Sequence, residues 1–469
     1  MARMDTARWL SEPGASEFTG AVLGDPRRTR RLCEIAERLS EDPTASFPDA
    51  FGSSAELEGF YRFIRNDNVS GEGVLEPHYS ASCGRAAEVG ECLAIHDTTE
   101  FTFKGERDGL GRTSSKAQGF FAHVSLLVAT DEARTPLGVV GSEQYARKDC
   151  RGRSTVEKRR DDECSEGLRW LRGAASVERR LAGRAKCIHV ADREGDTFQF
   201  LSGLLDLGAH FVIRVAQDRR LEDEFGDAIR LHDELLDMQP VACFDIAITA
   251  RGKRLNPTMA RTHPSRKERV ARVSMAATTV TVARPRSRLA GSPIELNLVR
   301  VWETQPPANE PPVEWILWTT EPVDSVGNIR RIVDFYRSRW VIEEFFKALK
   351  TGCSFEKRQL ESFKTLTTAL AVFVPVAWKL LLMRSLAQSR PEGPPSIVLT
   401  PIQIDFLEKK YGKRLETARA ALLATAELGG HLKQNGEPGW QTLGRGYEKL
   451  VAGEAFFSTL QSSPTCDQS

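Results

Sequence analysis

Three apolar segments with short polar connections constrain the fold of this chain more than any other feature. Residues 92–103, 119–129 and 136–145 are rich in β-branched and aromatic residues, and turn-forming or polar residues separate them. Strands joined by short connections pair antiparallel, because a parallel pair needs a long crossover. We therefore expect an antiparallel meander at the start of the sheet.

An alternation of strands and helices follows the meander. A helix-compatible stretch at about 155–183 precedes a short apolar strand, which a further helix separates from the next strand. This order implies parallel additions to the sheet, so the sequence predicts an α/β fold with a mixed sheet. Residues 216 to about 320 are again strand-like and predict a β-rich insertion. The segments after the meander are strand 187–192, helix 197–207, strand 211–215, and strand-like runs 241–249, 270–283, 294–303 and 314–320.

Helical sequence flanks this region on both sides. Residues 1–70 are polar and helix-like, residues 71–365 hold the sheet, and residues 366–469 are largely helical, which predicts three domains. The most apolar stretch, 369–378, is interrupted by Pro375. We interpret it as a buried helix that is too short to span a bilayer.

The charge balance excludes a uniformly basic surface but not a local one. The chain of 469 residues has 65 Lys and Arg against 64 Asp and Glu, a net charge of +1. Arginines cluster at 27–31 and 62–65, where we expect few acidic partners; such groups are either solvated helix faces or phosphate contacts. Between Arg251 and Arg272, eight basic residues face one acid, Glu268. This stretch is either an exposed hairpin or a basic insertion.

Cysteine usage and the amino terminus predict the compartment. Nine cysteines are scattered singly, which argues for reduced thiols and against a disulfide scaffold or a structural zinc site. The first 30 residues contain no apolar run of signal-peptide length. We therefore expect a soluble, intracellular protein.

A helix predicted from Asp324 or Ser325 to Gly352 carries a polar row. At about 100° per residue, four of its side chains share an arc of roughly 60° beside an apolar stripe. An acid flanked by a phenol, a guanidinium and an ammonium suits metal-assisted phosphodiester chemistry, although such a row is also compatible with a solvated face. The four residues are Tyr336, Arg339, Glu343 and Lys350.

Two more acids complete a possible metal site. Asp97 lies in the first strand and Asp192 ends the fourth, at a strand end where ligands gather in α/β sheets. Taken singly, a strand aspartate is more often a turn or cap residue. Together with Glu343, these carboxylates could hold two Mg²⁺ ions about 3.5–4 Å apart. Their order in the chain is that of a ribonuclease H-like nuclease core.

At this point the sequence resembles a known family. Tyr336, Arg339, Glu343 and Lys350 reproduce the YREK signature of the insertion-sequence-four group of DDE transposases. The resemblance runs from about residue 15 to about 455. It implies a ribonuclease H-like mixed-sheet core with a β-rich insertion at about 216–320, flanked by an N-terminal helical DNA-binding domain and a C-terminal helical dimerisation domain. Further matching motifs are at 23–29, 61–66, 97–99, 192–194, 321–323 and 339–345.

The resemblance also implies roles for individual residues. Asp97, Asp192 and Glu343 would be the metal-binding catalytic triad for Mg²⁺, with Mn²⁺ able to substitute. Trp315 would stack on a flipped-out base, the alternative being a packed core aromatic. The remaining implied DNA contacts are Tyr336, Arg339 and Lys350 beside the scissile bond, Arg27, Arg30, Arg62 and Arg65 from the N-terminal domain, and Arg214 with the 251–272 segment.

The implied function is that of a cut-and-paste DNA transposase. It would bind transposon ends, cleave them through a hairpin intermediate and transfer the 3′ ends into target DNA. Its partners would be double-stranded DNA and a second copy of the chain, paired through C-terminal helices around 439–450, with no membrane, in a bacterial cytoplasm at the nucleoid. The alternative is a catalytically silent, transposase-derived DNA-binding or inhibitory protein. His96, beside Asp97, is interpreted as a packed ring rather than a modulator of the metal site.

Overall fold

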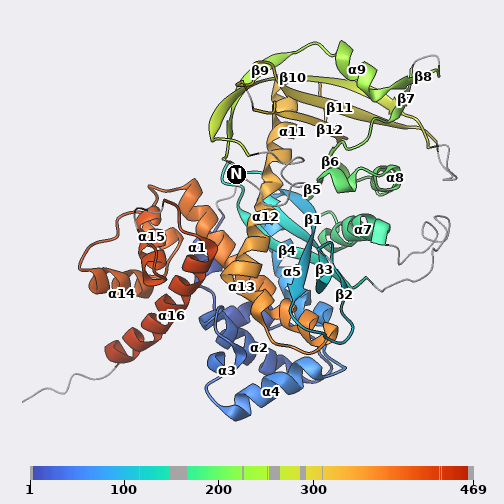
Figure 1. Ribbon diagram of the computed structural model, residues 1–469. Coiled ribbons are helices and arrows are strands. Elements are labelled where there is room, and N and C mark those ends of the chain that lie inside the picture. Colours follow the sequence, from blue (N-terminus) through green and yellow to red (C-terminus); the bar gives the residue numbers. More distant parts are fainter. Residues whose placement is uncertain are drawn as a thin grey trace, which may run out of the picture. The chain divides into compact units, whose positions relative to one another are not determined.

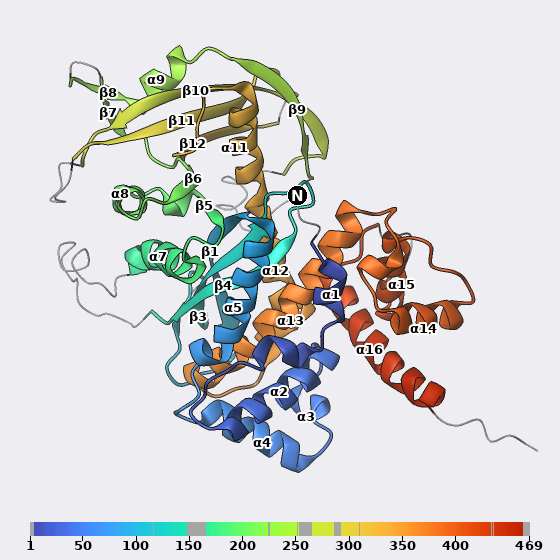
Figure 2. The same cartoon turned by 180° about the vertical axis from the view of Figure 1, so that it is seen from behind.

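A computed structural model gives the fold of the chain (Figures 1 and 2). It describes residues 4–115, 117–147, 166–223, 226–250, 252, 265–285, 292–308, 310–432, 434 and 436–462. The chain forms two compact units, and each is described by itself. The first consists of Met1–Cys187 with Trp340–Ser469, and the second of Ile188–Arg339.

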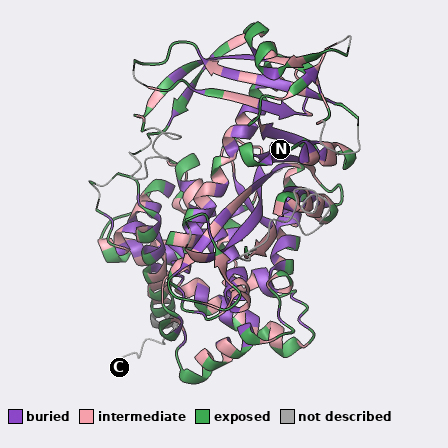
Figure 3. Cartoon of the chain, turned by 45° about the vertical axis from the view of Figure 1, so that its right-hand side comes forward, coloured by how far each residue is buried: buried purple, intermediate pink, exposed green. Residues whose placement is uncertain are grey.

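The sheet of the first unit is the predicted antiparallel meander. Strand β1 (Glu91–Phe103) pairs with β3 (Gln118–Ala129), which pairs with β4 (Pro136–Tyr145). A short strand in the connection between β1 and β3, β2 (Gly111–Arg112), also pairs antiparallel with β3. Nearly every residue of β3 is buried, because helices cover the sheet (Figure 3). The strand prediction for this part of the chain is confirmed.

Helices of the first unit come from both ends of the chain. Side-chain caps begin most of them: Asp25 accepts the Arg27 amide, and Ser53 accepts the Glu56 amide. Helices α5 and α7 pack against the meander strands. The N-terminal helices are α1 (Thr6–Ser11), η1 (Gly14–Phe18), α2 (Pro26–Glu41), α3 (Phe47–Ala50), α4 (Ser54–Arg65) and α5 (Gly71–Val89), and later come η2 (Glu166–Leu168) and α7 (Arg169–Leu181).

The longest helix, α13 (Phe363–Ser389), runs through the core of the first unit. It is long and apolar enough to cross a membrane by composition, so the expectation that this segment is too short was wrong. The expectation of burial is confirmed, because 94% of its most apolar window is covered by the rest of the protein. The other C-terminal elements are α12 (Trp340–Lys347), η4 (Ala348–Gly352), η5 (Phe355–Lys357), η6 (Pro395–Ile397), α14 (Pro401–Tyr411), α15 (Ala418–Leu428) and α16 (Trp440–Ser462).

A buried ionic cluster joins the N-terminal helices to the meander. Glu17 accepts hydrogen bonds from Arg85 (2.9 Å) and from Nδ1 of His78 (2.5 Å). The other His78 nitrogen, Nε2, accepts the Val139 amide of β4 at 3.1 Å. Arg85 also stacks on the ring of Trp378 in α13, 4.1 Å from its centroid. Because every partner is buried, this cluster fixes η1, α5, β4 and α13 together.

The second unit is built on a mixed sheet. Strand β5 runs parallel to β6, as the strand–helix–strand order predicts, and all later pairings are antiparallel. The strand order from β5 is β5-β6-β12-β11-β10-β7-β8, with β9 also on β10. The α/β class with a mixed sheet is therefore confirmed. The elements are β5 (Lys186–Ala191), η3 (Arg193–Gly195), α8 (Phe198–Asp206), β6 (His210–Arg214), β7 (Arg220–Glu222), β8 (Ala228–Arg230), α9 (Leu231–Asp237), β9 (Ala242–Ile248), β10 (Arg269–Val282), β11 (Ile294–Glu303), β12 (Glu314–Thr319) and α11 (Val326–Ser338).

Candidate active site

Asp97 lies in the middle of β1, on a half-buried stretch of an otherwise buried strand. The amide of Thr98 donates to its Oδ1 at 2.7 Å, which fixes one carboxylate oxygen. Side chains alternate along a strand, so Asp97 and Phe101 point to the same face of the sheet. This face is the one that the polar helix after residue 339 contacts.

Glu343 and Lys350 lie on the Asp97 face of the first unit. Helix α12, which carries Glu343, packs against β1. The ammonium of Lys350 lies 5.3 Å from the ring centroid of Phe101. Burial lowers the pKa of Lys350, and the charges of Glu356, Glu100 and Glu343 oppose that shift. Two of the three predicted acids and the predicted lysine are thus presented by the same side of the sheet.

Asp192 belongs to the second unit, directly after β5. It caps the short helix η3, and its Oδ1 accepts the Glu194 amide at 2.8 Å. The side chain is half-buried, and its cap hydrogen bond uses one oxygen only. Asp192 is therefore a helix cap, as a single strand aspartate often is, but only its Oδ1 serves in the cap.

Three other predicted residues of the second unit lie together. The Trp315 ring meets the Tyr336 ring edge-on, with centroids 5.9 Å apart. Arg214 donates to the Tyr336 hydroxyl at 3.4 Å and to the carbonyl oxygen of Glu314 at 3.1 Å. Tyr336 is buried and Trp315 only half-buried, so the tryptophan keeps part of its surface in solvent.

Sequence reasoning missed Arg193, which joins this group. Burial lowers its pKa, the charge of Arg214 lowers it further, and Tyr336 and Asp192 oppose the shift. The Arg193 guanidinium therefore interacts electrostatically with Asp192, Arg214 and Tyr336. Its position directly after Asp192 in the motif at 192–194 was the available signal.

The prediction that the polar row lies on one continuous helix was wrong. Helix α11 is capped by Ser325, as expected, but it ends at Ser338, and the Arg339 amide bonds back to the Tyr336 carbonyl at 3.0 Å. Helix α12 begins at Trp340, and residues Ala348–Gly352 form a π-helical turn. The arc of roughly 60° assumed uniform 3.6-residue turns, so it does not apply across the break or at Lys350.

The N-terminal arginines have acidic partners, contrary to expectation. Arg27 pairs with Asp25 at 3.1 Å and Arg62 with Glu58 at 3.6 Å. Arg65 pairs with Glu361, which is far away in sequence, at 3.4 Å. All of these arginines, and Arg30 as well, remain exposed. They are surface ion pairs of low energy that a phosphate can replace.

The basic stretch 251–272 is described only in part, since 251 and 253–264 lie outside the described residues. Within its described part, Arg269 pairs with Glu303 and Glu310, and Arg272 pairs with Asp245 at 3.1 Å. These contacts neutralise Arg269 and Arg272.

The C-terminal residues expected to pair two subunits are used inside the protomer. Trp440, Leu443 and Leu450 of α16 are buried, and the Trp440 indole donates to Glu344 of α12 at 2.9 Å. These apolar residues of α16 therefore pack against other parts of the same chain.

His96 and the cysteines behave as packed residues. His96 is buried and hydrogen-bonds to Ser125 at 2.9 Å, so it is the packed ring that we expected. Cysteines 33, 83, 92, 187, 243 and 353, which are those the structure describes, are free thiols.

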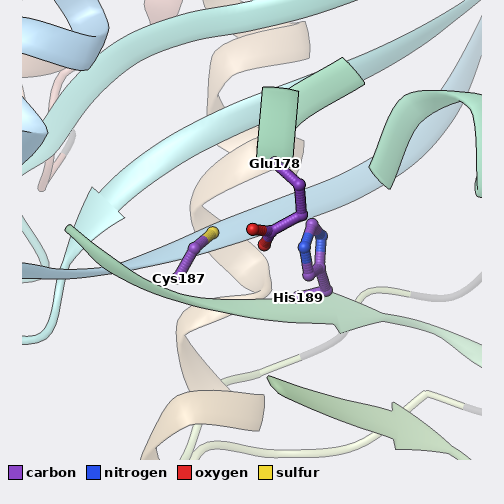
Figure 4. A group of neighbouring side chains, drawn as sticks. All are labelled: Glu178, Cys187 and His189. Atoms are coloured by element: carbon purple, nitrogen blue, oxygen red, sulfur yellow. The ribbon is translucent and has the colours of Figure 1, made fainter. Parts of the chain in front are cut away.

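One other group of possible metal ligands is Glu178 of α7 with Cys187 and His189 of β5, whose ligand atoms lie within 4.8 Å of one another (Figure 4). A hydrogen bond with Cys92 and burial raise the pKa of the Cys187 thiol well above its ordinary value. Because a metal binds the thiolate, this environment favours a packed polar cluster over a metal centre.

Two family models match this chain. A family model described as "Transposase DNA-binding" matches residues 9–69, and one described as "Transposase DDE domain" matches residues 89–373. The first covers η1, helices α2 to α4 and the end of α1, and the second covers the strands of both units and all three predicted acids. The second match takes in more than half of the chain. The chain therefore belongs to the transposases with a DDE domain.

Proposed function

We propose that this protein is a cut-and-paste transposase of the insertion-sequence-four group that cleaves transposon ends and inserts them elsewhere. The observation that carries the proposal is the matched DDE domain with acids at all three expected positions, Asp97, Asp192 and Glu343. The finer resemblance of its spaced motifs to the Tn-five transposase supports a hairpin route.

The acids of the first unit fit a divalent cation. Asp97 and Glu343 are half-buried carboxylates presented to the same face, and hard oxygen donors suit Mg²⁺ or Mn²⁺. In the proposal Asp192 supplies the third carboxylate. Cations held by these residues would activate the attacking oxygen and stabilise the leaving oxygen in an in-line displacement at phosphorus.

Basic and phenolic groups of the chain would hold the substrate phosphates. Arg214 already orients the Tyr336 hydroxyl, and Arg193 adds a second guanidinium beside it. Arg339, directly after α11, and Lys350, in η4, would complete the set. Guanidinium groups bind phosphate oxygens through paired hydrogen bonds, so they fix the DNA backbone in register.

Trp315 would hold a base that has been turned out of the duplex. Half-buried and supported from one side by Tyr336, it can offer its remaining surface to a base. Stacking of this kind is worth about 1–3 kcal/mol, which offsets the cost of unstacking the base.

The proposed reaction is a series of displacements at phosphorus. A water oxygen first cleaves the end and leaves a 3′-hydroxyl; that hydroxyl attacks the opposite strand and forms a hairpin. A second water opens the hairpin, and the 3′-hydroxyl then attacks target DNA. Each step forms one P–O bond and breaks another, so a single carboxylate site can serve all of them.

The same proposal includes two subunits acting together on paired ends, in a bacterial cytoplasm at the nucleoid. The N-terminal match to a transposase DNA-binding family supports duplex DNA as the partner. In the proposal the two copies pair through their C-terminal helices.

A nicking assay tests the function. Bound ends are first selected from a random duplex pool, and the full-length protein is then incubated with such an end and Mg²⁺. Nicks at the end with the wild type, and their loss in Asp97→Ala, support the proposal. Tight end binding without nicks would instead favour the silent, inhibitory alternative.

A further inference from the structure

Strand alternation places Asp97 and Thr98 on opposite faces of the meander. Thr98 opposes His123 across the β1–β3 ladder, and their side chains hydrogen-bond at 2.9 Å. His96 opposes Ser125 in the same way. These four polar side chains therefore share the face behind Asp97.

Helix α7 holds Thr98 from that rear face. Nε of Arg169 donates to the Thr98 hydroxyl at 3.0 Å, and its Nη1 donates to the Glu166 carbonyl at 2.8 Å. Arg169 is 9% exposed. Burying a guanidinium costs free energy unless its N–H groups make hydrogen bonds, so the bond from Arg169 to Thr98 helps to offset that cost. Thr98 is thus fixed by its side chain while its amide fixes the Asp97 carboxylate.

The hydrogen bonds run in one direction along this chain of residues. Burial, with the charges of Arg169 and Arg172, lowers the pKa of His123 to about 3, so the ring is neutral. Arg169 can only donate, so the Thr98 hydroxyl accepts from it and is left to donate to Nδ1 of His123. The Thr98 hydroxyl thus uses both its acceptor and its donor, whereas Nε2 of His123 is buried without a hydrogen-bond partner among the described residues.

We propose that Thr98 and Arg169 are positioning residues, which orient the Asp97 carboxylate for a divalent cation from behind the sheet. The inference rests on the function proposed above. If the hydroxyl is lost, the residue that carries the Asp97-binding amide is no longer held by α7, and the carboxylate loses its fixed orientation. Second-layer partners of this kind change metal affinity by about 10–100-fold.

Direct measurement of Mn²⁺ binding tests the inference without relying on activity. The full-length protein is titrated with Mn²⁺, and free Mn²⁺ is followed by electron paramagnetic resonance. Thr98→Val, which keeps the shape of the side chain, and Arg169→Gln are expected to weaken binding about 10-fold or more. Thr98→Ser restores the hydroxyl and is expected to bind like the wild type.

Matched controls separate this inference from the proposed function. Ser125→Ala removes a hydrogen bond on the same face, two pairs along the ladder, and is expected to leave Mn²⁺ binding unchanged. Asp97→Ala reports the metal site itself. If Asp97→Ala loses Mn²⁺ while Thr98→Val and Arg169→Gln bind normally, the positioning role is wrong and the metal site stands.

The remaining outcomes are also decisive. Normal Mn²⁺ binding by Asp97→Ala contradicts the metal site and the positioning role together. Equal weakening by Ser125→Ala and Thr98→Val means that general packing of the face is responsible, which overturns the inference. Thermal unfolding shows which variants fold; should Thr98→Val not fold, Arg169→Gln, which leaves β1 and β3 unchanged, gives the same answer.

Discussion

The ring of Trp315 meets Tyr336 edge-on, with their centroids 5.9 Å apart and their planes at 60°. Tyr336 in turn receives a hydrogen bond from Arg214, so the tryptophan is supported by a residue that is itself held in place. An aromatic ring fixed on one side and partly exposed on the other is suited to stacking.

Trp315→Ala is expected to slow hairpin formation about 10- to 100-fold while slowing first-strand nicking much less. The reason is that the turned-out base is needed only when the strand bends into the hairpin. Gel analysis of nicked and hairpin products over time measures both steps, and Trp315→Phe should retain most of the hairpin rate. Equal slowing of the two steps would contradict a stacking role.

Glu343→Gln is expected to reduce cleavage at least about 100-fold, because a metal ligand contributes no less than its second-layer partners. Glu344→Gln is the matched control. That neighbouring carboxylate is committed to Lys347 at 2.6 Å and to the Trp440 indole at 2.9 Å, so its loss should affect stability rather than catalysis. End binding, measured by gel shift, should persist in both variants. Cleavage that survives in Glu343→Gln removes this residue from the catalytic set.

Arg193→Ala is expected to weaken binding of transposon ends. The slope of the logarithm of the binding constant against the logarithm of salt concentration should fall by about 1, which corresponds to the loss of one phosphate contact. Its guanidinium shares the surroundings of Asp192, Arg214 and Tyr336. Arg272→Ala is the control, since that residue is exposed and paired with Asp245. Binding is measured at several salt concentrations, and an unchanged slope for Arg193→Ala would place this residue outside the DNA contact.

The Glu17 cluster is expected to make the folded state sensitive to acid. Burial lowers the pKa of His78, and protonation of its Nε2 would break the bond from the Val139 amide. Its contribution to stability is therefore complete above the ordinary histidine pKa of about 6.5 and declines below it. Burial alone would raise the pKa of Glu17, but His78 and Arg85 hold it well below its ordinary value, so a second loss begins below about pH 4.3.

Thermal unfolding from pH 8 to pH 2 measures this dependence. In Glu17→Gln the second loss should disappear, and stability at pH 7 should fall by about 3–5 kcal/mol because Arg85 is left buried without its charged partner. A wild-type unfolding temperature that does not change between pH 8 and pH 5 would show that His78 keeps its ordinary pKa.

Local pattern determined much of this protein. The strands of the meander, the parallel β5–β6 pair and the burial of α13 follow from apolar periodicity and connection length, which neighbouring residues in the sequence specify. The positions of Asp97, Asp192 and Glu343 followed from the same pattern together with the family resemblance, and their joint role remains a prediction, as does the division into three domains.

Tertiary structure alone decided the rest, because it depends on residues far apart in the chain. Arg65 is paired by Glu361, α16 uses its apolar residues on its own core, and the helix predicted to run without interruption breaks at Arg339. The hold of Arg169 on Thr98 joins residues 71 positions apart. Sequence periodicity gives the face on which a side chain lies, whereas the partner it meets there depends on how distant elements pack.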